Sequence, residues 1–282
     1  MSRARRWFPI LTAGSLVVLI AAVCLAPMLT PYDSLAVQMD KVLQPPGDGH
    51  LFGTDELGRD VFTRLLYGGR VSLLVGAAAM LVSMLIGVSY GAISGLAGGV
   101  VDRVMMRIVD ACLSVPSLLF MIGLQLLFSP GLLSVIFVIS VTSWMSVARM
   151  IRTEILSMKR DVFIQASAVV GASSGQLLRR HLLPQCLPTI SVMAISGVSH
   201  AILGEATLSF LGMGIPPHEP SWGNMLMGAQ GHLLAGAWWL AVFPGLCITY
   251  TVLVVTYLGD KLQDRLTAPQ HRQGGNHERL SS

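Results

Sequence analysis

The sequence contains uncharged apolar stretches that are too long for the core of a soluble domain. The longest runs from Ala111 to Ala148 without Asp, Glu, Lys or Arg, and a second runs from Val71 to Val101. A helix needs about 20 mostly apolar residues to cross a bilayer. Hydrophobic residues make up 53% of the 282 residues and charged residues only 12%, more apolar surface than one soluble core could bury. The sequence therefore predicts an all-α integral membrane protein.

Six membrane-spanning helices account for these stretches. The stretch from Ala111 to Ala148 is too long for one crossing, because at about 1.5 Å per residue it would extend well beyond a hydrocarbon core of about 30 Å. Ser129, Pro130 and Gly131 predict a turn near its middle. The expected spans are 7–29, 71–101, 105–128, 132–150, 189–214 and 232–259.

The positions of Lys and Arg indicate the orientation, since these residues collect on the cytoplasmic side of short loops. With a cytoplasmic N-terminus, only Lys41, Arg59, Arg64 and Arg70 fall outside, and six spans return the C-terminus to the cytoplasm. The expected organisation is a cytoplasmic tail at 1–6, a first span at 7–29, an outer loop at 30–70, a five-helix core at 71–266 with a cytoplasmic loop at 151–188, and a disordered cytoplasmic tail at 267–282.

Two alternatives follow from the same charges. Arginines before the apolar stretch 7–29 are also typical of a secretory signal peptide, although this stretch is long for a signal and the remaining chain is itself membrane-bound. The formal net charge of +4 would favour a nucleic-acid partner only if the basic residues formed one face. They lie in short clusters between apolar stretches, so no nucleic-acid partner is expected.

Small residues recur every fourth position along the second expected span, at Gly87, Gly91, Gly95 and Gly99. Helices in a bilayer associate where small residues let their backbones approach. This face predicts a packed helix pair inside the subunit, with a contact between subunits as the alternative.

Ionisable groups inside a membrane are costly and need a reason. Glu205 lies in the fifth expected span on a face shared with Ser209, so it should point into the helix bundle. A structural role in fixing the outer end of this span is expected, with a pathway or gating role as the alternative. His200 lies roughly 140° around the helix from Glu205. It is expected as a buried histidine bonded to a neighbouring helix, or alternatively as a substrate contact.

The cytoplasmic loop at 151–188 is longer than a connection requires. Its pattern predicts a short helix over 163–173 that ends near Gly171, and a second element from Leu177 that stops at Pro184. A short, partly apolar helix exposed on this side favours a protein partner that covers it.

This loop resembles the cytoplasmic hallmark of the inner-membrane permeases of binding-protein-dependent ABC importers. In that family Glu-Ala-Ala is followed by Gly four residues later and by an apolar-x-Leu-Pro ending. The chain departs from this hallmark at three positions. Gln165 replaces the acid, Ser167 replaces the second alanine, and His181 replaces the apolar residue before Leu-Pro. The resemblance implies a type I ABC importer permease fold and a loop that contacts a partner ATPase through Gln165, Ala166, Ser167, Gly171, Ala172, Ser173, Leu183 and Pro184.

The first outer loop narrows the resemblance to the peptide and nickel permeases. Its segment Gly53-Thr54-Asp55-Glu56-Leu57-Gly58-Arg59-Asp60 resembles that group's Gly-Thr-Asp-x-x-Gly-Arg-Asp motif, and residues 208–214 with 219–223 resemble the ending of its fifth span. Gly53 and Gly58 bracket a turn, and Asp60 stands at a helix N-cap position. Val61, Phe62, Leu65 and Leu66 then predict a short amphipathic helix at the outer interface, as an anchor or as a surface for the substrate-binding protein.

The resemblance implies a permease subunit of the cell inner membrane that forms half of a translocation pathway for di- or oligopeptides, with nickel or a metallophore as the alternative substrate. It also implies a second, homologous permease, two cytoplasmic ABC ATPase subunits and an extracytoplasmic substrate-binding protein. The chain lacks the motif G-x-x-x-x-G-K-[ST]. We therefore expect no enzyme activity, no metal and no cofactor on this chain, with ATP and Mg²⁺ bound by the partner ATPases.

Two other classes are less consistent with the sequence. An ion-driven secondary transporter would be expected to carry more intramembrane acids and a repeated half. A membrane scaffold could have six spans, but it would have no use for the pattern in the cytoplasmic loop.

Overall fold

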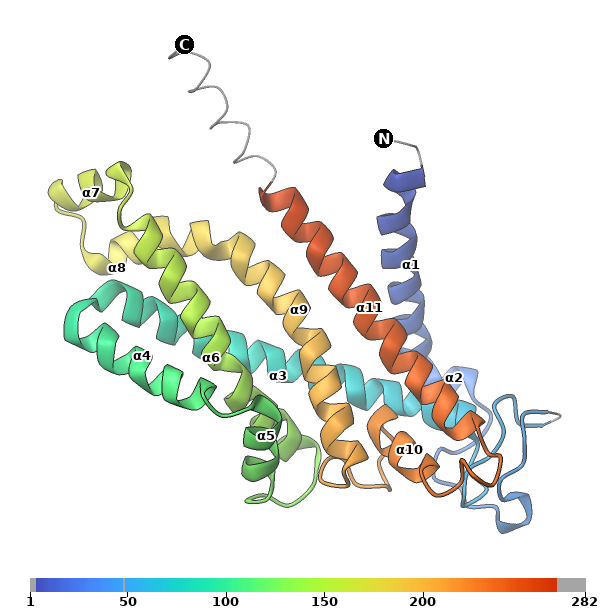
Figure 1. The fold of residues 1–282 in the computed structure, drawn as a ribbon. Coiled ribbons are helices and arrows are strands. Elements are labelled where there is room, and N and C mark those ends of the chain that lie inside the picture. The colour runs from blue at the N-terminus through green and yellow to red at the C-terminus, as the bar shows by residue number, and fades with distance from the viewer. Residues whose placement is uncertain (1–3, 48, 268–282) are drawn as a thin grey trace. The chain divides into compact units, whose positions relative to one another are not determined.

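A computed structural model describes residues 4–47 and 49–267 (Figure 1). In this part of the chain, regular structure is helical apart from two isolated bridges, Gly47 with His50 and Thr54 with Asp60. The elements are α1 (Ala4–Cys24), α2 (Ala26–Leu29), η1 (Met39–Lys41), α3 (Val61–Ala97), α4 (Gly99–Leu113), α5 (Ser117–Gln125), α6 (Leu132–Met158), α7 (Val162–Val169), α8 (Ser174–Leu177), η2 (Leu178–Leu182), α9 (Leu183–Phe210), α10 (Trp222–Ala229) and α11 (Trp239–Thr267). The expected tail at 267–282 lies outside the described residues, apart from Thr267.

The described helices confirm an all-α, multi-pass membrane protein. Four are long and apolar enough to cross a bilayer: Val61–Ala97, Leu132–Met158, Ser174–Phe210 and Trp239–Leu266. The pair α4 and α5 adds a fifth if it forms one bent span, whereas the apolar part of α1, Pro9–Cys24, is shorter. Six spans and the orientation of the two termini stay predictions.

The span expected over 105–128 is not one continuous helix. The structure divides it into α4 and α5, which meet at an angle of 86°. Pro116 lies between them, and a proline removes a backbone N–H donor and disfavours the helical conformation of the residue before it. The turn expected at 129–131 is present, since α5 ends at Gln125 and α6 begins at Leu132.

The start and end of α3 also differ from expectation. There is no separate interfacial helix before the second span, because α3 begins at Val61 and continues to Ala97. At the other end, Gly98 and Gly99 have φ values of +63° and +56°, which end the helix. Gly99 therefore belongs to α4, where a side chain would meet open space, and it is not part of the packed glycine face.

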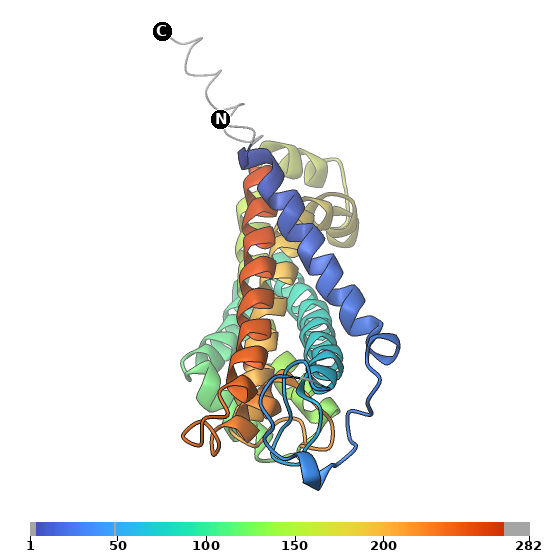
Figure 2. The same cartoon turned by 90° about the vertical axis from the view of Figure 1, so that its right-hand side faces the viewer.

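The described residues form two compact units. Unit 1 comprises the residues up to Met80, Pro116–Thr142 and Gly197–Val255, and unit 2 comprises Leu81–Val115, Ser143–Ser196 and the residues from Thr256 on. One apolar core of unit 1 joins Val75 and Ala79 of α3 to α6 and α9, and its members there are Val135, Val138, Ile139, Ala201 and Leu208. A second core surrounds Trp222, whose Nε1 donates to the Leu65 carbonyl at 2.9 Å. Figure 2 shows α10 beside the first turns of α3.

In unit 2, three of the expected glycines let α3 approach α6 closely. A Cβ atom on Gly87 would lie 2.6 Å from Val147 Cβ, and one on Gly95 would lie 2.9 Å from Ile155 Cγ2. A Cβ on Gly91 would collide with the Ala148 carbonyl oxygen. The contact they make is thus between two helices of the same chain.

Replacement of Gly91 by Ala is expected to destabilise the protein by about 1–3 kcal/mol, because the added methyl group forces two packed backbones apart. Thermal unfolding of the purified full-length chain in detergent measures the effect as a lower Tm. Gly14→Ala on α1 is the control, since a Cβ there meets nothing within 4 Å. Equal Tm values for the two variants would contradict the close approach of α3 and α6.

Candidate functional site

Among its described side chains, the short helix α7 contacts the rest of unit 2 through Phe163 and Ile164. Ile164 is buried, and the Phe163 ring packs edge-on against the His181 ring with 5.0 Å between the ring centroids. Gly171 follows with a φ of +96°, a left-handed conformation that glycine adopts without strain. This glycine lets the chain reverse between α7 and α8.

The segment after Gly171 is helical for longer than the sequence indicates. Ser173 and Gln176 form a capping box at the start of α8, each side chain bonding the other's backbone N–H. The π-helical turn η2 then leads directly into α9. The expected stop at Pro184 is wrong, because the helical path that starts at Ser174 continues through this proline to Phe210.

The outward side of this loop carries exposed apolar side chains among polar ones. Val162 is 82% exposed and Val170 is 88% exposed. Gln165, Ala166 and Gly171 are also exposed, and Gln165 donates from Nε2 only to the nearby Arg160 carbonyl at 3.2 Å. Side chains Ser173, Gln176 and Arg179 line a hollow of about 710 Å³ next to it. The loop thus presents a surface of the kind that a protein partner covers.

The end of α6 that leads into this loop is fastened to α3 and α4 by contacts that the sequence analysis missed. Asp102 accepts from Arg152 Nε at 2.8 Å, from Arg152 Nη2, and from Ser94 Oγ at 2.6 Å. Lys159 Nζ donates to the carbonyls of Gly95 and Leu96 at 3.2 and 3.0 Å. No local pattern links residues 50 positions apart, although a lone acid beside an apolar stretch gives a weak signal.

The outer motif of unit 1 forms a hydrogen-bonded turn. Asp55 Oδ1 accepts from the backbone N–H groups of Leu57 and Arg59 at 2.9 Å each, and Thr54 Oγ1 accepts from the Gln44 N–H at 2.8 Å. Gly53 and Gly58 have φ values of +75° and +70°, as a turn between them requires. Trp239 Nε1 donates to the Thr54 carbonyl at 3.1 Å and attaches the turn to α11.

Asp60 caps α3, as its position in the sequence predicts. Its Oδ2 accepts from the N–H and the hydroxyl of Thr63 at 2.8 and 2.7 Å, and its Oδ1 lies 2.9 Å from His50 Nδ1. Leu65, Leu66 and Arg64 are all buried, so the turns that follow are not amphipathic at a surface.

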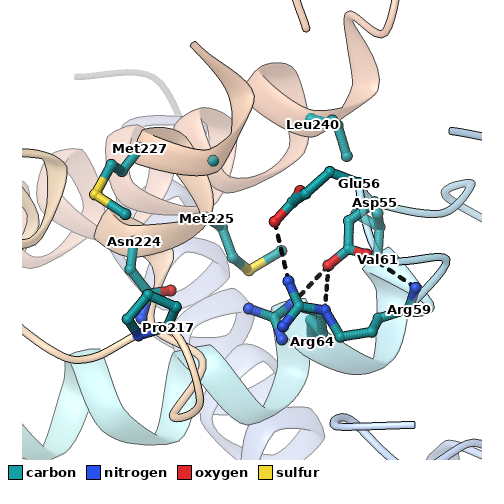
Figure 3. Close-up of a pocket in the computed structure, with 11 residues that line it drawn as sticks. Asp55, Glu56, Arg59, Val61, Arg64, Pro217, Asn224, Met225, Met227 and Leu240 are labelled. Atoms are coloured by element: carbon teal, nitrogen blue, oxygen red, sulfur yellow. Dashed lines mark hydrogen bonds and ion pairs between the residues drawn. The ribbon is translucent and has the colours of Figure 1, made fainter. Parts of the chain in front are cut away.

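The motif also lines a small cavity with α10 (Figure 3). Arg59 Nε donates to Asp55 Oδ2 at 2.6 Å, and Arg59 Nη2 lies 3.0 Å from Glu56 Oε1. Arg64 Nε lies 3.4 Å from the same Asp55 oxygen. Gly53, Thr54 and Asp60 shape the turn, whereas Asp55, Arg59 and the unpredicted residue Arg64 reach the cavity.

Glu205 lies at the centre of a buried hydrogen-bond network. Its side chain is fully buried, with Ser209 Oγ donating to Oε1 at 2.7 Å and Ser72 Oγ donating to Oε2 at 2.8 Å. The same hydroxyls accept from the backbone N–H groups of Ile215 and Trp222 at 3.0 and 3.2 Å. Glu205 therefore joins α3, α9 and the start of α10.

His200 is exposed on α9, in contrast to the buried position expected for it. The expectation came from placing it in the middle of an apolar span, which does not say whether a residue faces the protein. The structure does not bring His200 into the network of Glu205.

Comparisons with known proteins agree with this architecture. Residues 87–268 match the family described as "Binding-protein-dependent transport system inner membrane component". The dipeptide transport system permease protein DppC of Bacillus subtilis is 41% identical over 242 residues, covering 86% of this chain and 76% of that protein. The oligopeptide transport system permease protein OppC of the same organism is 38% identical, covering 89% and 82%.

Two further matches extend the comparison. A putative peptide transport system permease protein of Brucella suis is 40% identical over 266 residues, covering 93% of this chain and 88% of that protein. A solved structure of the MetNI methionine ABC transporter, in inward-facing conformations, aligns with a TM-score of 0.60 and 20% identity over 73% of this chain and 97% of that chain. At this identity the structural likeness concerns the fold.

Proposed function

Because the chain belongs to the family of inner-membrane components of binding-protein-dependent transport systems, we propose that it forms half of the translocation pathway of an ATP-driven importer for di- and oligopeptides. A second, homologous permease supplies the other half. Two cytoplasmic ATPase subunits, which bind ATP and Mg²⁺, drive the cycle, and an extracytoplasmic binding protein delivers the substrate. In this scheme residues 159–183 face the cytoplasm and the outer motif faces the opposite side.

The observation that carries the coupling role is the exposure of Val162 at the start of α7 and of Val170 after its end, beside Gly171. An ATPase groove that receives α7 would bury Val162 and Val170 and would meet Gln165 and Ala166 at its edge. Energy enters through different affinities of the ATPases for ATP in the inward-open and outward-open states. Gln165 in place of an acid keeps hydrogen-bonding capacity but offers no ion pair to the groove.

Peptides are favoured as substrate because the reported relatives are named for dipeptide, oligopeptide or peptide transport at 38–41% identity. A nickel or metallophore importer is not favoured by these names. Family membership also argues against an ion-driven secondary transporter and against a scaffold.

Uptake by the reconstituted complex tests the proposal. Proteoliposomes that contain this chain, its partner permease, both ATPases and the binding protein are expected to accumulate a labelled dipeptide in an ATP-dependent, vanadate-sensitive manner. Uptake should vanish when the ATPases are omitted. Accumulation of a labelled nickel chelate instead of the dipeptide would overturn the substrate assignment, and uptake that persists without ATPases would overturn the coupling.

A further inference from the structure

The cavity beside the outer motif has no part in the coupling described above. Its volume is about 120 Å³, and its walls include Asp55, Arg59, Arg64, Asn224 and Met227 (Figure 3). A cavity needs about 10–15 Å³ of volume measured in this way to hold one water molecule, so this cavity has room for several heavy atoms. It is too small for an oligopeptide and large enough for one small chemical group.

Arg64 is a buried cation whose partners are distant. Its side chain is 4% exposed, and its contacts are Nε to Asp55 Oδ2 and Nη1 to the Ser34 carbonyl, each at 3.4 Å. A guanidinium carries a fork of N–H donors suited to both oxygens of a carboxylate. A charge removed from water is costly unless it is well paired, so Arg64 has donor capacity for a closer acceptor.

Asp55 does not satisfy this need, because its carboxylate is already occupied. Oδ1 accepts two backbone N–H groups and Oδ2 accepts Arg59 Nε at 2.6 Å. Glu56, the more exposed of the two acids, forms an ion pair with Arg59, with 3.0 Å between Glu56 Oε1 and Arg59 Nη2. The charges of the two acids and the two arginines sum to zero. Both carboxylates nevertheless lie closer to the guanidinium of Arg59, and the contact of Arg64 with Asp55 is the longest of these ion pairs.

The remaining walls select against a polar or bulky ligand. Asn224 already bonds at both ends of its amide: Nδ2 donates to the carbonyls of Ile215, Pro216 and Glu219, and Oδ1 accepts from the Ser221 N–H at 3.0 Å. Met225, Met227 and Leu240 supply apolar surface. A fitting ligand therefore has one anionic head and a short aliphatic stem.

We propose that this cavity is a binding site for a carboxylate group, held by the guanidinium of Arg64 and packed against Met225, Met227 and Leu240. The source of the carboxylate rests on the proposed function: it is either the C-terminus of a peptide substrate or an Asp or Glu side chain of the extracytoplasmic binding protein. The site itself requires only the described residues of unit 1.

Binding of propionate to the full-length chain in lipid nanodiscs tests the site, with propionamide as the uncharged analogue and ligand-observed NMR as the readout. Propionate is expected to bind and propionamide not. Arg64→Gln should weaken propionate binding about tenfold or more, because a charge-assisted contact is lost. Arg70→Gln is the matched control on the same helix, since Arg70 bonds to the carbonyls of Val23 and Cys24 outside the cavity.

A second variant keeps the test decisive if Arg64→Gln fails to fold. Met227→Trp leaves Arg64 intact and enlarges a side chain that lines the cavity, so it should also abolish propionate binding. Equal binding of propionate and propionamide to the unaltered chain would overturn the proposal. Unchanged propionate affinity in both Arg64→Gln and Met227→Trp would do the same.

Competition with bound propionate distinguishes the two possible sources of the carboxylate, the peptide substrate and the binding protein. Displacement of propionate by trialanine, but not by trialanine amide, assigns the carboxylate to the substrate. Displacement by the purified binding protein alone assigns it to an acidic side chain of that partner. The measurement needs no ATPase, so its failure is distinguishable from a failure of ATP-driven uptake.

Discussion

Replacement of Gly171 by Arg is expected to lower ATP-driven peptide uptake by about 100-fold, the upper range of a coupling free energy between two sites, while the chain still reaches the membrane. A Cβ at Gly171 meets nothing within 4 Å, so a long side chain does not disturb the packing of unit 2 itself. It would instead project into the surface that we assign to the ATPase. Labelled dipeptide uptake in proteoliposomes measures the loss, and immunoblots of the membrane fraction measure the amount of protein.

Two variants separate steric block from backbone strain at this position. Gly171→Ala introduces only the strain of a positive φ, about 1–2 kcal/mol for a residue with a Cβ, and is expected to keep most of the uptake. Gly231→Arg places the same bulk in another open position, outside the loop, and should transport normally. Normal uptake by Gly171→Arg would refute the coupling assignment, and equal losses in Gly171→Ala and Gly171→Arg would attribute the effect to strain.

Replacement of Glu205 by Ala is expected to lower the free energy of unfolding by about 3 kcal/mol or more, since each hydrogen bond to a carboxylate contributes about 1.5–3 kcal/mol. The hydroxyls of Ser72 and Ser209 would lose their acceptor inside a fully buried space. The backbone at Ile215 and Trp222, which those hydroxyls hold, would then loosen. A lower Tm of the purified chain and reduced recovery of the assembled complex are the measurements.

Glu205→Gln is expected to have a smaller effect than Glu205→Ala, because the amide oxygen still accepts from one serine while the amide nitrogen cannot accept from the other. Glu219→Ala is the matched control, since Glu219 is an exposed acid on the segment that follows α9. An unchanged Tm and an unchanged basal ATPase rate for Glu205→Gln and Glu205→Ala would show that the network has no structural or gating role.

Features set by neighbours in the sequence could be predicted. The turn at Ser129 to Gly131 follows from residues that break helices, and the cap at Asp60 follows from its place directly before an apolar helix. The helical class follows from the length of the uncharged stretches. In each case the cause lies within a few residues of the effect.

Features set by long-range packing could not be predicted. Arg64 falls within the short amphipathic helix expected at the outer interface, but α10 and the turn at Asp55 cover it, and neither contact is visible from the spacing along α3. The pair of Asp102 and Arg152 likewise depends on α4 folding back against α6. Pro116 lies inside the span expected over 105–128, and the structure bends the chain there.

The ammonium group of Lys159 has a mechanical consequence. It sits on the last carbonyls of α3, at the point where α6 ends and the chain turns toward α7. Helix ends usually fray because their terminal carbonyls lack partners. A frayed helix end can move without moving the helix next to it. Here the ammonium group joins the end of α6 to the end of α3, so in the proposed coupling we expect a displacement of α7 to be passed on to α3.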